Sequence, residues 1–374
     1  MSETMVGSTT LMPQGIPDDL IPIFKKLRDT PFACSDIADV PGQHVNSTFF
    51  ATLSKPLPDG SKSVLFKHTK GWDAPWLGIA IDAARCFTEH DVHSKGICPI
   101  INENGFVIRP PRLLHFIPEY STQIIENLEN TVTLPEYLRS SDAISPSFAT
   151  SLGRAVGSWL ALFHHRNSEE NGSGPAATRR EKIPDRELYF NLYRGTLETQ
   201  IRMSPQLFEG YEEAIRQRVQ EGLKKDIQGR MGLIHGDLGA RHFLIRNDVP
   251  IPNQDTILTP IDWETVHFGC QNQDFGQLIG ELILVGQTDD QAFSDQVLQG
   301  LARGYQSLDE DSMFHVVFYA GLHLLMVLLT EGEPNTPMQN KMVGFARDCI
   351  VKGSQHDRQW LETTSLKYLL VASQ

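Results

Sequence analysis

The segment from residue 232 to residue 278 constrains the fold most, because two short apolar runs within it each end at a carboxylate. The run Leu233–Ile234 leads into His235-Gly236-Asp237, and the run Leu258–Ile261 leads into Asp262. Short apolar runs bounded by turn residues are typical of strands, and the glycine between His and Asp permits a tight turn. We therefore expect a small β-rich island whose strand ends carry two carboxylates.

The chain around this island has a helical pattern. Pro146–Arg166 carries apolar residues at helical spacing, and helices are expected again over 186–223 and from about residue 273 onward. The run Phe314–Leu329 is strongly apolar, but it contains two histidines and is too short to span a bilayer. We expect it to form a buried helix.

The first third of the chain has strand patterns instead. Runs rich in Val, Thr and Phe at 44–54 and 63–69 flank the turn sequence PLPDGSK, which predicts a hairpin. A helix is expected near Asp18–Arg28 and another over Trp76–Ser94. Three more short strands are expected at 106–108, 113–116 and 123–128.

These patterns predict an α+β fold with two lobes. The expected organisation is a flexible tail over 1–15, a β-rich N-lobe over 16–128, and a mainly helical C-lobe over 129–374. A chain of 374 residues with 40% hydrophobic residues is long and apolar enough to build two cores.

Charge and cysteine content restrict the partners. The formal net charge is −13, which argues against nucleic acid or an anionic membrane as partner and favours a cationic or neutral small molecule. The five cysteines are scattered without a CxxC pair, which indicates a reducing compartment. No signal-peptide pattern opens the sequence, so we expect a cytoplasmic protein. The oligomeric state cannot be read from the sequence.

Two carboxylates on neighbouring strand ends suit phosphoryl transfer. One carboxylate orients and deprotonates the acceptor hydroxyl, and the other holds a divalent ion across the nucleotide phosphates. We assign the first role to Asp237 and the second to Asp262, since Mg²⁺ prefers oxygen ligands.

The sequence HGDLGARHFLI, followed by IDWE and by Asp274, resembles the signature of the aminoglycoside phosphotransferase and choline kinase superfamily. The resemblance is close over 232–278 and looser over most of 40–330. It implies a bilobal, protein-kinase-like fold that uses ATP and Mg²⁺, with Mn²⁺ as the alternative. It also implies transfer to a hydroxyl of a small molecule: an amino alcohol, an aminoglycoside, a hydroxylated amine or a secondary metabolite.

Upstream residues match the nucleotide-binding parts of that family. The segment GQHVNSTFF is similar to its glycine loop, so the resemblance places Gly42, Asn46 and Ser47 near the phosphates. Lys67 stands where the family keeps its phosphate-binding lysine, and a lysine ammonium is a suitable point cation.

Two further upstream parts follow from the resemblance. Glu89 resembles the acid that pairs with the lysine, with Asp82 and Asp91 as competitors on the same predicted helix. The segment around Glu126 and Leu128 resembles the linker whose backbone hydrogen-bonds adenine.

One residue departs from the family pattern: His242 stands where the family has an asparagine that binds metal. An imidazole nitrogen is a softer ligand than an amide oxygen and suits manganese or zinc better than magnesium. Three outcomes stay open at this point. His242 ligates a metal, it orients Asp237 through a hydrogen bond, or it marks a loss of phosphoryl transfer.

Three alternative functions remain in view. The His242 departure and the single glycine of the 42–50 loop are compatible with a pseudokinase that binds nucleotide or ligand without transfer. A protein kinase is disfavoured by HGDL and IDW in place of His-Arg-Asp and Asp-Phe-Gly. A metal hydrolase is disfavoured because no dense HxH or HExxH cluster occurs.

Overall fold

The structure of the chain is a computed structural model, and it forms two compact units. Unit 1 comprises Met1–Asp73, Ala80–Ser94 and Pro111–Glu129, and unit 2 comprises Ala74–Ile79, Lys95–Pro110 and Asn130–Gln374. The structure describes residues 16–40, 46–74, 79–140, 145–168, 184–225, 230–248, 254–288, 291–306, 308–330 and 336–372. The predicted tail over 1–15 lies outside the described residues.

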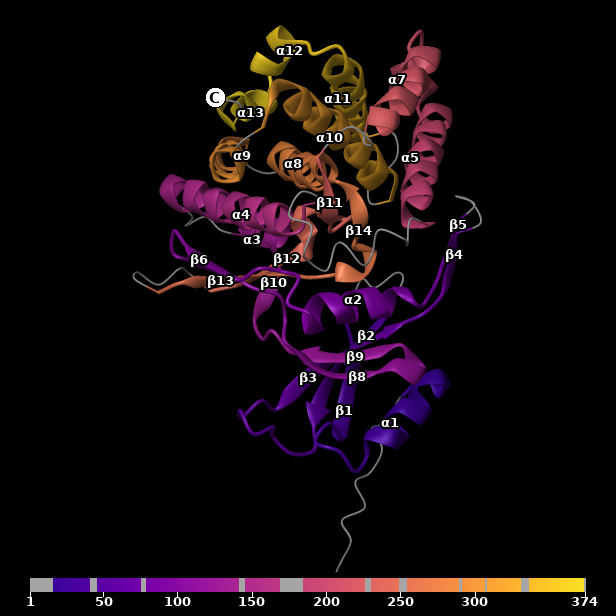
Figure 1. The fold of residues 1–374 in the computed structure, drawn as a ribbon, viewed down its shortest axis with the longest axis vertical. Helices are drawn as coiled ribbons and strands as arrows, with labels where there is room; N and C mark the ends of the chain where they lie inside the picture. Colours follow the sequence, from indigo (N-terminus) through magenta and orange to yellow (C-terminus); the bar gives the residue numbers. More distant parts are fainter. Residues whose placement is uncertain are drawn as a thin grey trace, which may run out of the picture. The chain divides into compact units, whose positions relative to one another are not determined.

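Unit 1 is built on an antiparallel five-stranded sheet with the order β1-β2-β3-β9-β8 (Figure 1). Its strands are β1 (Cys34–Asp39), β2 (Asn46–Leu53), β3 (Ser63–Thr69), β8 (Leu113–Ile117) and β9 (Thr122–Glu126). Antiparallel β2 and β3 form the predicted hairpin, whose connection contains Gly60 with a φ of 87°. The strand β1 was not predicted, because its sequence alternates poorly.

The two faces of this sheet carry different helices (Figure 1). On one face, α1 (Ile21–Leu27) packs Phe24 against Phe66 of β3, with ring centroids 5.2 Å apart in an apolar core. Side chains alternate along a strand, so Lys67 points to the other face. There α2 (Arg85–Ser94) supplies Glu89.

The helix predicted over Trp76–Ser94 is wrong in its first part. The strands β4 (Trp72–Ala74) and β5 (Ile79–Ile81) form a two-stranded ribbon, and the helix begins only at Arg85. Residues 75–78 lie outside the described part of the chain. The alternation of isoleucine and alanine in β5 favours a strand, and an aspartate-capped turn follows it before the helix.

Unit 2 contains a second five-stranded sheet with the order β10-β12-β13-β7-β6. Its strands are β6 (Ile101–Glu103), β7 (Phe106–Ile108), β10 (Thr131–Thr133), β12 (Phe243–Arg246) and β13 (Thr256–Pro260). The strand at 106–108 was expected in the smaller lobe, but β7 pairs in parallel with β13. A parallel partner distant in sequence leaves no local signal, so only the folded chain reveals this pairing.

The expected β-rich island also contains an antiparallel ribbon of β11 (Met231–Ile234) and β14 (His267–Cys270). The strand β14 was not predicted from the sequence. The ribbon β11–β14 and the strand β13 together position the two carboxylate-bearing turns.

The remainder of unit 2 is helical, as predicted (Figure 1). The helices are α3 (Leu134–Ser140), α4 (Pro146–Arg166), α5 (Pro184–Met203), α6 (Pro205–Phe208), α7 (Glu212–Lys225), α8 (Gln271–Thr288), α9 (Gln291–Tyr305), α10 (Glu310–Thr330), α11 (Pro337–Ser354), α12 (Arg358–Glu362) and α13 (Leu369–Ala372). The helices α4 and α9 cross at backbone contact, because a Cβ at Gly153 or Gly157 would lie about 2 Å from carbonyl oxygens of α9.

The apolar helix α10 forms the core of unit 2, which confirms the predicted buried helix. The expectation that this segment is too short to span a bilayer is wrong, because the helix extends over 21 residues. By length and composition alone it could span a membrane, but 78% of its most apolar window is buried inside the protein. It packs against α5, α8 and α11.

Candidate active site

Two tight turns in unit 2 hold the two predicted carboxylates. After β11 the chain turns at Gly236, whose φ of +86° and whose space suit only glycine, since a Cβ would lie 2.6 Å from the Thr265 carbonyl oxygen. After β13 the chain turns at Asp262, which is itself left-handed with a φ of 68°. A non-glycine residue in this conformation is strained, and such strain is concentrated at functional sites. Asp237 and Asp262 are both partly exposed, so both carboxylates are accessible.

The turn that carries Asp237 is held by the first turns of α8. The buried Asp274 carboxylate accepts hydrogen bonds from the backbone N–H groups of His235 (2.8 Å) and Gly236 (2.9 Å). Gln277 accepts from the Leu238 N–H at 2.8 Å and donates to the Gly236 carbonyl at 2.8 Å. The loop backbone is therefore fixed from one side by three hydrogen-bond acceptors and a donor.

His164 of α4 completes this support. Its Nε2 lies 3.1 Å from Asp274 Oδ2, and its Nδ1 lies 2.8 Å from the Tyr305 hydroxyl. Burial by itself would raise the pKa of Asp274, but the hydrogen bond from His164 and neighbouring groups lower it. The carboxylate is thus ionised, which strengthens the hydrogen bonds that it accepts.

Asp237 lies at the end of a chain of charged side chains. Arg241 donates from Nη2 to Asp237 Oδ1 at 2.9 Å and also contacts Glu281 of α8. His323 of the core helix α10 lies 2.9 Å from the same glutamate. Burial favours the protonated form, but Arg241 and the nearby imidazoles hold the pKa of Asp237 at about 2. Asp237 is therefore ionised at neutral pH and is a weak base.

The geometry of His242 fixes which of its ring nitrogens is available. Its Nδ1 lies 2.5 Å from the Asp237 carbonyl oxygen, which can only accept, so Nδ1 carries the proton. Burial and the charge of Arg241 lower the pKa of His242 to about 4, so the ring is neutral near pH 7. Its Nε2 therefore presents a lone pair and lies 3.6 Å from Asp262 Oδ2 and 3.9 Å from Asp237 Oδ2.

The predicted phosphate-binding lysine is paired within unit 1. Lys67 Nζ lies 3.0 and 2.9 Å from the two Glu89 carboxylate oxygens, and both side chains are buried. Gln123 of β9 donates to the same glutamate at 2.8 Å. The competing acids are engaged elsewhere, since Asp82 accepts from the Ala84 N–H and Asp91 lies beside His90. Of the three acidic residues, Glu89 is thus the one that pairs with Lys67.

Asn46 and Ser47, two of the predicted phosphate contacts, lie at the start of β2. Gly42 lies outside the described residues. Asn46 accepts from Arg85 at 3.0 Å, and Ser47 pairs with His68 in the β2–β3 ladder.

The predicted linker residues lie at the end of β9. Glu126 donates its N–H to the Arg112 carbonyl, and its carboxylate accepts from the backbone N–H and the guanidinium of Arg112. Leu128 follows two residues later.

The residues of α8 and α10 that support the Asp237 turn were not predicted from the sequence. Gln277 binds the Asp237 loop, Glu281 contacts Arg241, and His323 in turn contacts Glu281; none of the three was predicted. One signal was available: Gln273, Gln277 and Glu281 recur at intervals of four in α8, and Asp274 lies three residues before Gln277, which places these side chains on one side of the helix.

No cluster of three or more metal-binding side chains occurs among the described residues. The donors near the carboxylate turns are Asp262, with His242 beside it. Two protein ligands with open positions are typical of an ion that is bound together with nucleotide phosphates.

Comparisons with known proteins identify relatives over most of the chain. A family described as "Phosphotransferase enzyme family" matches residues 124–312. The phosphotransferase FrzJ of Cladobotryum sp is 28% identical over 361 residues, covering 91% of this chain and 94% of that protein. The 4-hydroxytryptamine kinase of Psilocybe cyanescens is 22% identical and covers 78% of this chain and 79% of its own length.

Solved structures share the fold at low identity. Amicoumacin kinase hAmiN, in complex with AMP-PNP, Ca²⁺ and Ami, has a TM-score of 0.52 at 14% identity, covering 90% of this chain and 94% of that one. Choline kinase LicA from Streptococcus pneumoniae has a TM-score of 0.50 at 14% identity, covering 89% and 98%. These likenesses agree with the α+β, kinase-like architecture.

Proposed function

The chain belongs to the phosphotransferase enzyme family and is a small-molecule kinase, and from that premise we propose that it transfers the γ-phosphate of ATP to a substrate hydroxyl. The observation that carries this proposal is the joint geometry of Asp237, His242 and Asp262. Two carboxylates on separate turns flank one imidazole nitrogen within 3.9 Å. Phosphoryl transfer needs one carboxylate for the acceptor and another for the metal.

Asp237 acts on the acceptor hydroxyl chiefly by orienting it. A pKa of about 2 makes this carboxylate a poor proton acceptor in the ground state. As a hydrogen-bond acceptor it aims the hydroxyl oxygen at the phosphorus, and it takes the proton once the new P–O bond has acidified that hydroxyl. Positioning and charge neutralisation are the main sources of rate in this reaction class.

Asp262 and His242 are the residues that would hold the divalent ion. The fit is supported by the fixed tautomer of His242, whose unprotonated Nε2 faces the Asp262 carboxylate. When bound, the ion would neutralise charge on the nucleotide phosphates. A nitrogen donor in place of an amide oxygen favours Mn²⁺ over Mg²⁺ relative to an all-oxygen site.

Unit 1 supplies the nucleotide contacts in this proposal. Lys67, held by Glu89, would bind the α- and β-phosphates, and the 42–48 segment with Asn46 and Ser47 would cover them. The backbone around Glu126 and Leu128 would contact adenine.

We infer that the acceptor is a hydroxylated amine. Two kinases of 4-hydroxytryptamine are among the relatives, and the net charge of −13 favours a cationic substrate. None of the comparisons supports a pseudokinase that binds nucleotide without transfer.

The test is a thermal shift measurement with ATP and either Mg²⁺ or Mn²⁺. A ligand that binds only the folded state raises the apparent melting temperature. We expect the rise to depend on both nucleotide and metal, to vanish in Asp262→Ala and to persist in Asp311→Ala, whose side chain is 91% exposed. A screen of hydroxylated amines for ADP release then identifies the acceptor. No shift with any nucleotide would refute the ATP site, whereas a shift without ADP release from any acceptor would favour the pseudokinase.

A further inference from the structure

Glu281 of α8 is a buried carboxylate that lies directly against the loop after Asp237. It is 5% exposed, and a Cβ at Gly239 would collide with its carboxylate oxygens. Its Oε2 accepts the backbone N–H of Arg241 at 3.1 Å, and its Oε1 contacts the guanidinium of the same residue. Burying a carboxylate is costly unless it is paired and hydrogen-bonded, and Arg241 supplies both kinds of contact.

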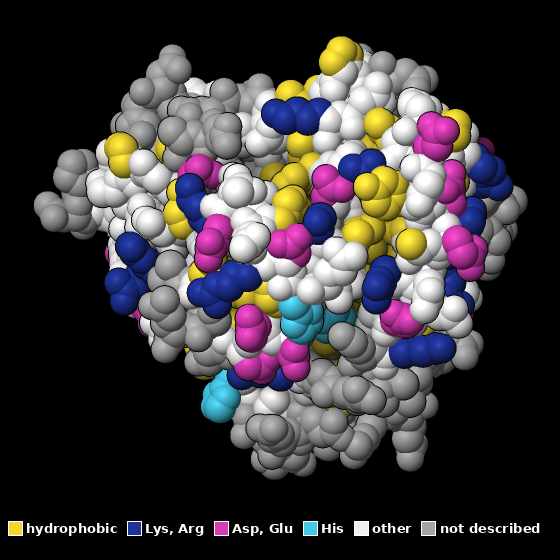
Figure 2. All heavy atoms as spheres, turned by 90° about the horizontal axis from the view of Figure 1, so that it is seen from above, with side chains coloured by type: hydrophobic (Ala, Val, Ile, Leu, Met, Phe, Trp, Pro, Cys, Tyr) yellow, Lys and Arg dark blue, Asp and Glu magenta, His cyan; other side chains and the backbone are white. Residues whose placement is uncertain are grey.

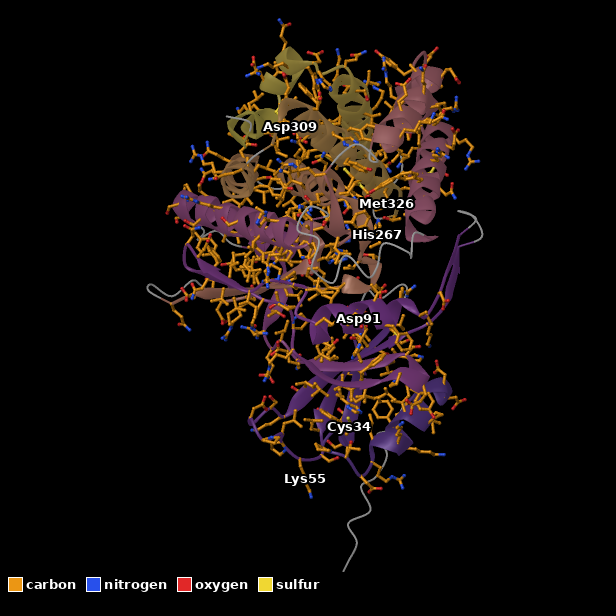
Figure 3. The ribbon with its side chains drawn as sticks, in the orientation of Figure 1. Cys34, Lys55, Asp91, His267, Asp309 and Met326 are labelled. Atoms are coloured by element: carbon orange, nitrogen blue, oxygen red, sulfur yellow. The ribbon has the colours of Figure 1, made fainter. Side chains whose placement is uncertain are left out.

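The core helix α10 holds this carboxylate as well. His323 is fully buried, and its Nε2 lies 2.9 Å from Glu281 Oε1. It lies one turn before Met326, which is labelled in Figure 3 on the same helix. Contacts from α10 and from the 239–241 loop therefore fix the Glu281 carboxylate, and the carboxylate in turn fixes Arg241.

Ion pairs on the surface of this protein have a different environment. On the face shown in Figure 2, described acidic and basic side chains are interspersed at the surface. Arg358 and Glu362 form such a pair on α12, with both side chains more than half exposed, and solvent weakens pairs of this kind. The side chain of Glu281 is only 6% exposed, so it can hold the guanidinium of Arg241 in one orientation.

The guanidinium of Arg241 has a buried end and an accessible end. Its Nη1 is buried and faces Glu281, whereas the side chain as a whole is 26% exposed. Its Nη2 donates to Asp237 Oδ1 at 2.9 Å. A guanidinium has five N–H donors, so contacts with two carboxylates leave donors for a third acceptor.

A hydroxyl that Asp237 orients brings the transferred phosphoryl group towards this accessible end. The hydroxyl oxygen lies about 2.7 Å from the carboxylate, and the phosphorus lies about 3–3.5 Å from that oxygen before the reaction. The Nη2 of Arg241 contacts the same carboxylate. The phosphoryl oxygens can therefore meet the guanidinium, whose planar fork matches their geometry.

We propose that Arg241 is a further catalytic residue, which binds the phosphoryl group during transfer, and that Glu281, backed by His323, is its positioning residue. This inference rests on the proposed function. In this step the acceptor oxygen bonds to the γ-phosphorus, the bond from that phosphorus to the bridging oxygen of ADP breaks, and Asp237 takes the hydroxyl proton. Arg241 donates hydrogen bonds to the phosphoryl oxygens, so their negative charge lies next to a preorganised cation.

The test uses a mimic of the transferred group and needs no acceptor. Aluminium fluoride, together with ADP and Mn²⁺, imitates the phosphoryl group during transfer, so calorimetry of the full chain compares ADP binding with and without it. We expect aluminium fluoride to tighten ADP binding in the wild type by about a hundredfold, and this gain to fall about tenfold or more in Arg241→Lys and Arg241→Met.

Two controls accompany this measurement. ADP binding without aluminium fluoride should be unchanged in both Arg241 variants, which also shows that they fold. Arg246→Met, which changes an exposed arginine of β12, is the matched substitution and should keep the full gain. If ADP binds but the wild type shows no gain, or if the Arg241 variants keep it, the catalytic role of Arg241 is overturned. If the wild type does not bind ADP at millimolar concentration, the proposed function fails and this inference fails with it.

The positioning role of Glu281 is tested through its dependence on Arg241. Glu281→Gln should lower the aluminium fluoride gain in the wild-type background but not in the Arg241→Met background, because a positioning residue acts only through its partner. An equal loss in both backgrounds would refute the positioning role, since a merely structural contribution does not depend on the arginine.

Discussion

Asp274 offers the sharpest test of how the turn that carries Asp237 is held. Its carboxylate accepts three hydrogen bonds: from the backbone N–H groups of His235 (2.8 Å) and Gly236 (2.9 Å) and from His164 Nε2 (3.1 Å). The Asp274→Asn variant keeps the shape but replaces one acceptor oxygen with an NH₂ donor. If the amide oxygen stays on Gly236, the NH₂ group faces the donors of both His235 and His164.

The expected loss of stability follows from the number of hydrogen bonds that the substitution disrupts. Two hydrogen bonds to a charged acceptor contribute about 1.5–3 kcal/mol each, so Asp274→Asn should lower the free energy of unfolding by about 3–6 kcal/mol. With a urea dependence of about 2–3 kcal/mol per molar, the unfolding midpoint should fall by roughly 1–3 M. Trp159 and Trp263 are fully buried in unit 2, so tryptophan fluorescence reports the transition.

The pH dependence of this destabilisation is an independent test. The folded-state pKa of Asp274 is lowered, so its contribution is complete above the unfolded-state pKa and is lost as pH falls through the folded-state value. Asp274→Asn should therefore destabilise more at pH 7 than in acid. The control is Asp311→Asn on the exposed start of α10, which should change the midpoint little. A loss below about 1 kcal/mol, or a loss that does not depend on pH, would contradict this account of the loop.

Three further predictions test the flanking groups. Lys67→Met should lower the free energy of unfolding by about 3–5 kcal/mol, because it leaves the Glu89 carboxylate buried without its cation. The double variant with Glu89→Gln should recover much of this loss in thermal unfolding. Equal melting temperatures of the single and double variants would contradict this account of the pair. His242→Asn should reduce the preference for Mn²⁺ over Mg²⁺ in nucleotide-dependent thermal shifts, and an unchanged ratio would show that the imidazole does not bind metal. Arg241→Met should raise the pKa of Asp237 from about 2 towards its usual 3.8, and the acid limb of the pH–rate profile should move to higher pH. An acid limb that does not move would show that Arg241 does not lower the pKa of Asp237.

The local patterns of the sequence determined most elements of this protein. Pro146–Arg166 and Ser63–Thr69 have in the structure the bounds that their patterns predict. Periodicity is a property of neighbouring residues, so it survives without knowledge of the fold. The carboxylates Asp237 and Asp262 were also proposed from the sequence, because each lies within three residues of the end of a short apolar strand.

Only the tertiary structure decided which distant residues meet. It paired β7 with β13, chose Glu89 over two competing acids for Lys67, and brought Glu281 and His323 behind Arg241. It also fixed the tautomer of His242 through a carbonyl five residues away. Apart from the His242 tautomer, these outcomes depend on distances between groups separated by tens of residues, and such distances are set by packing, which local propensity does not encode.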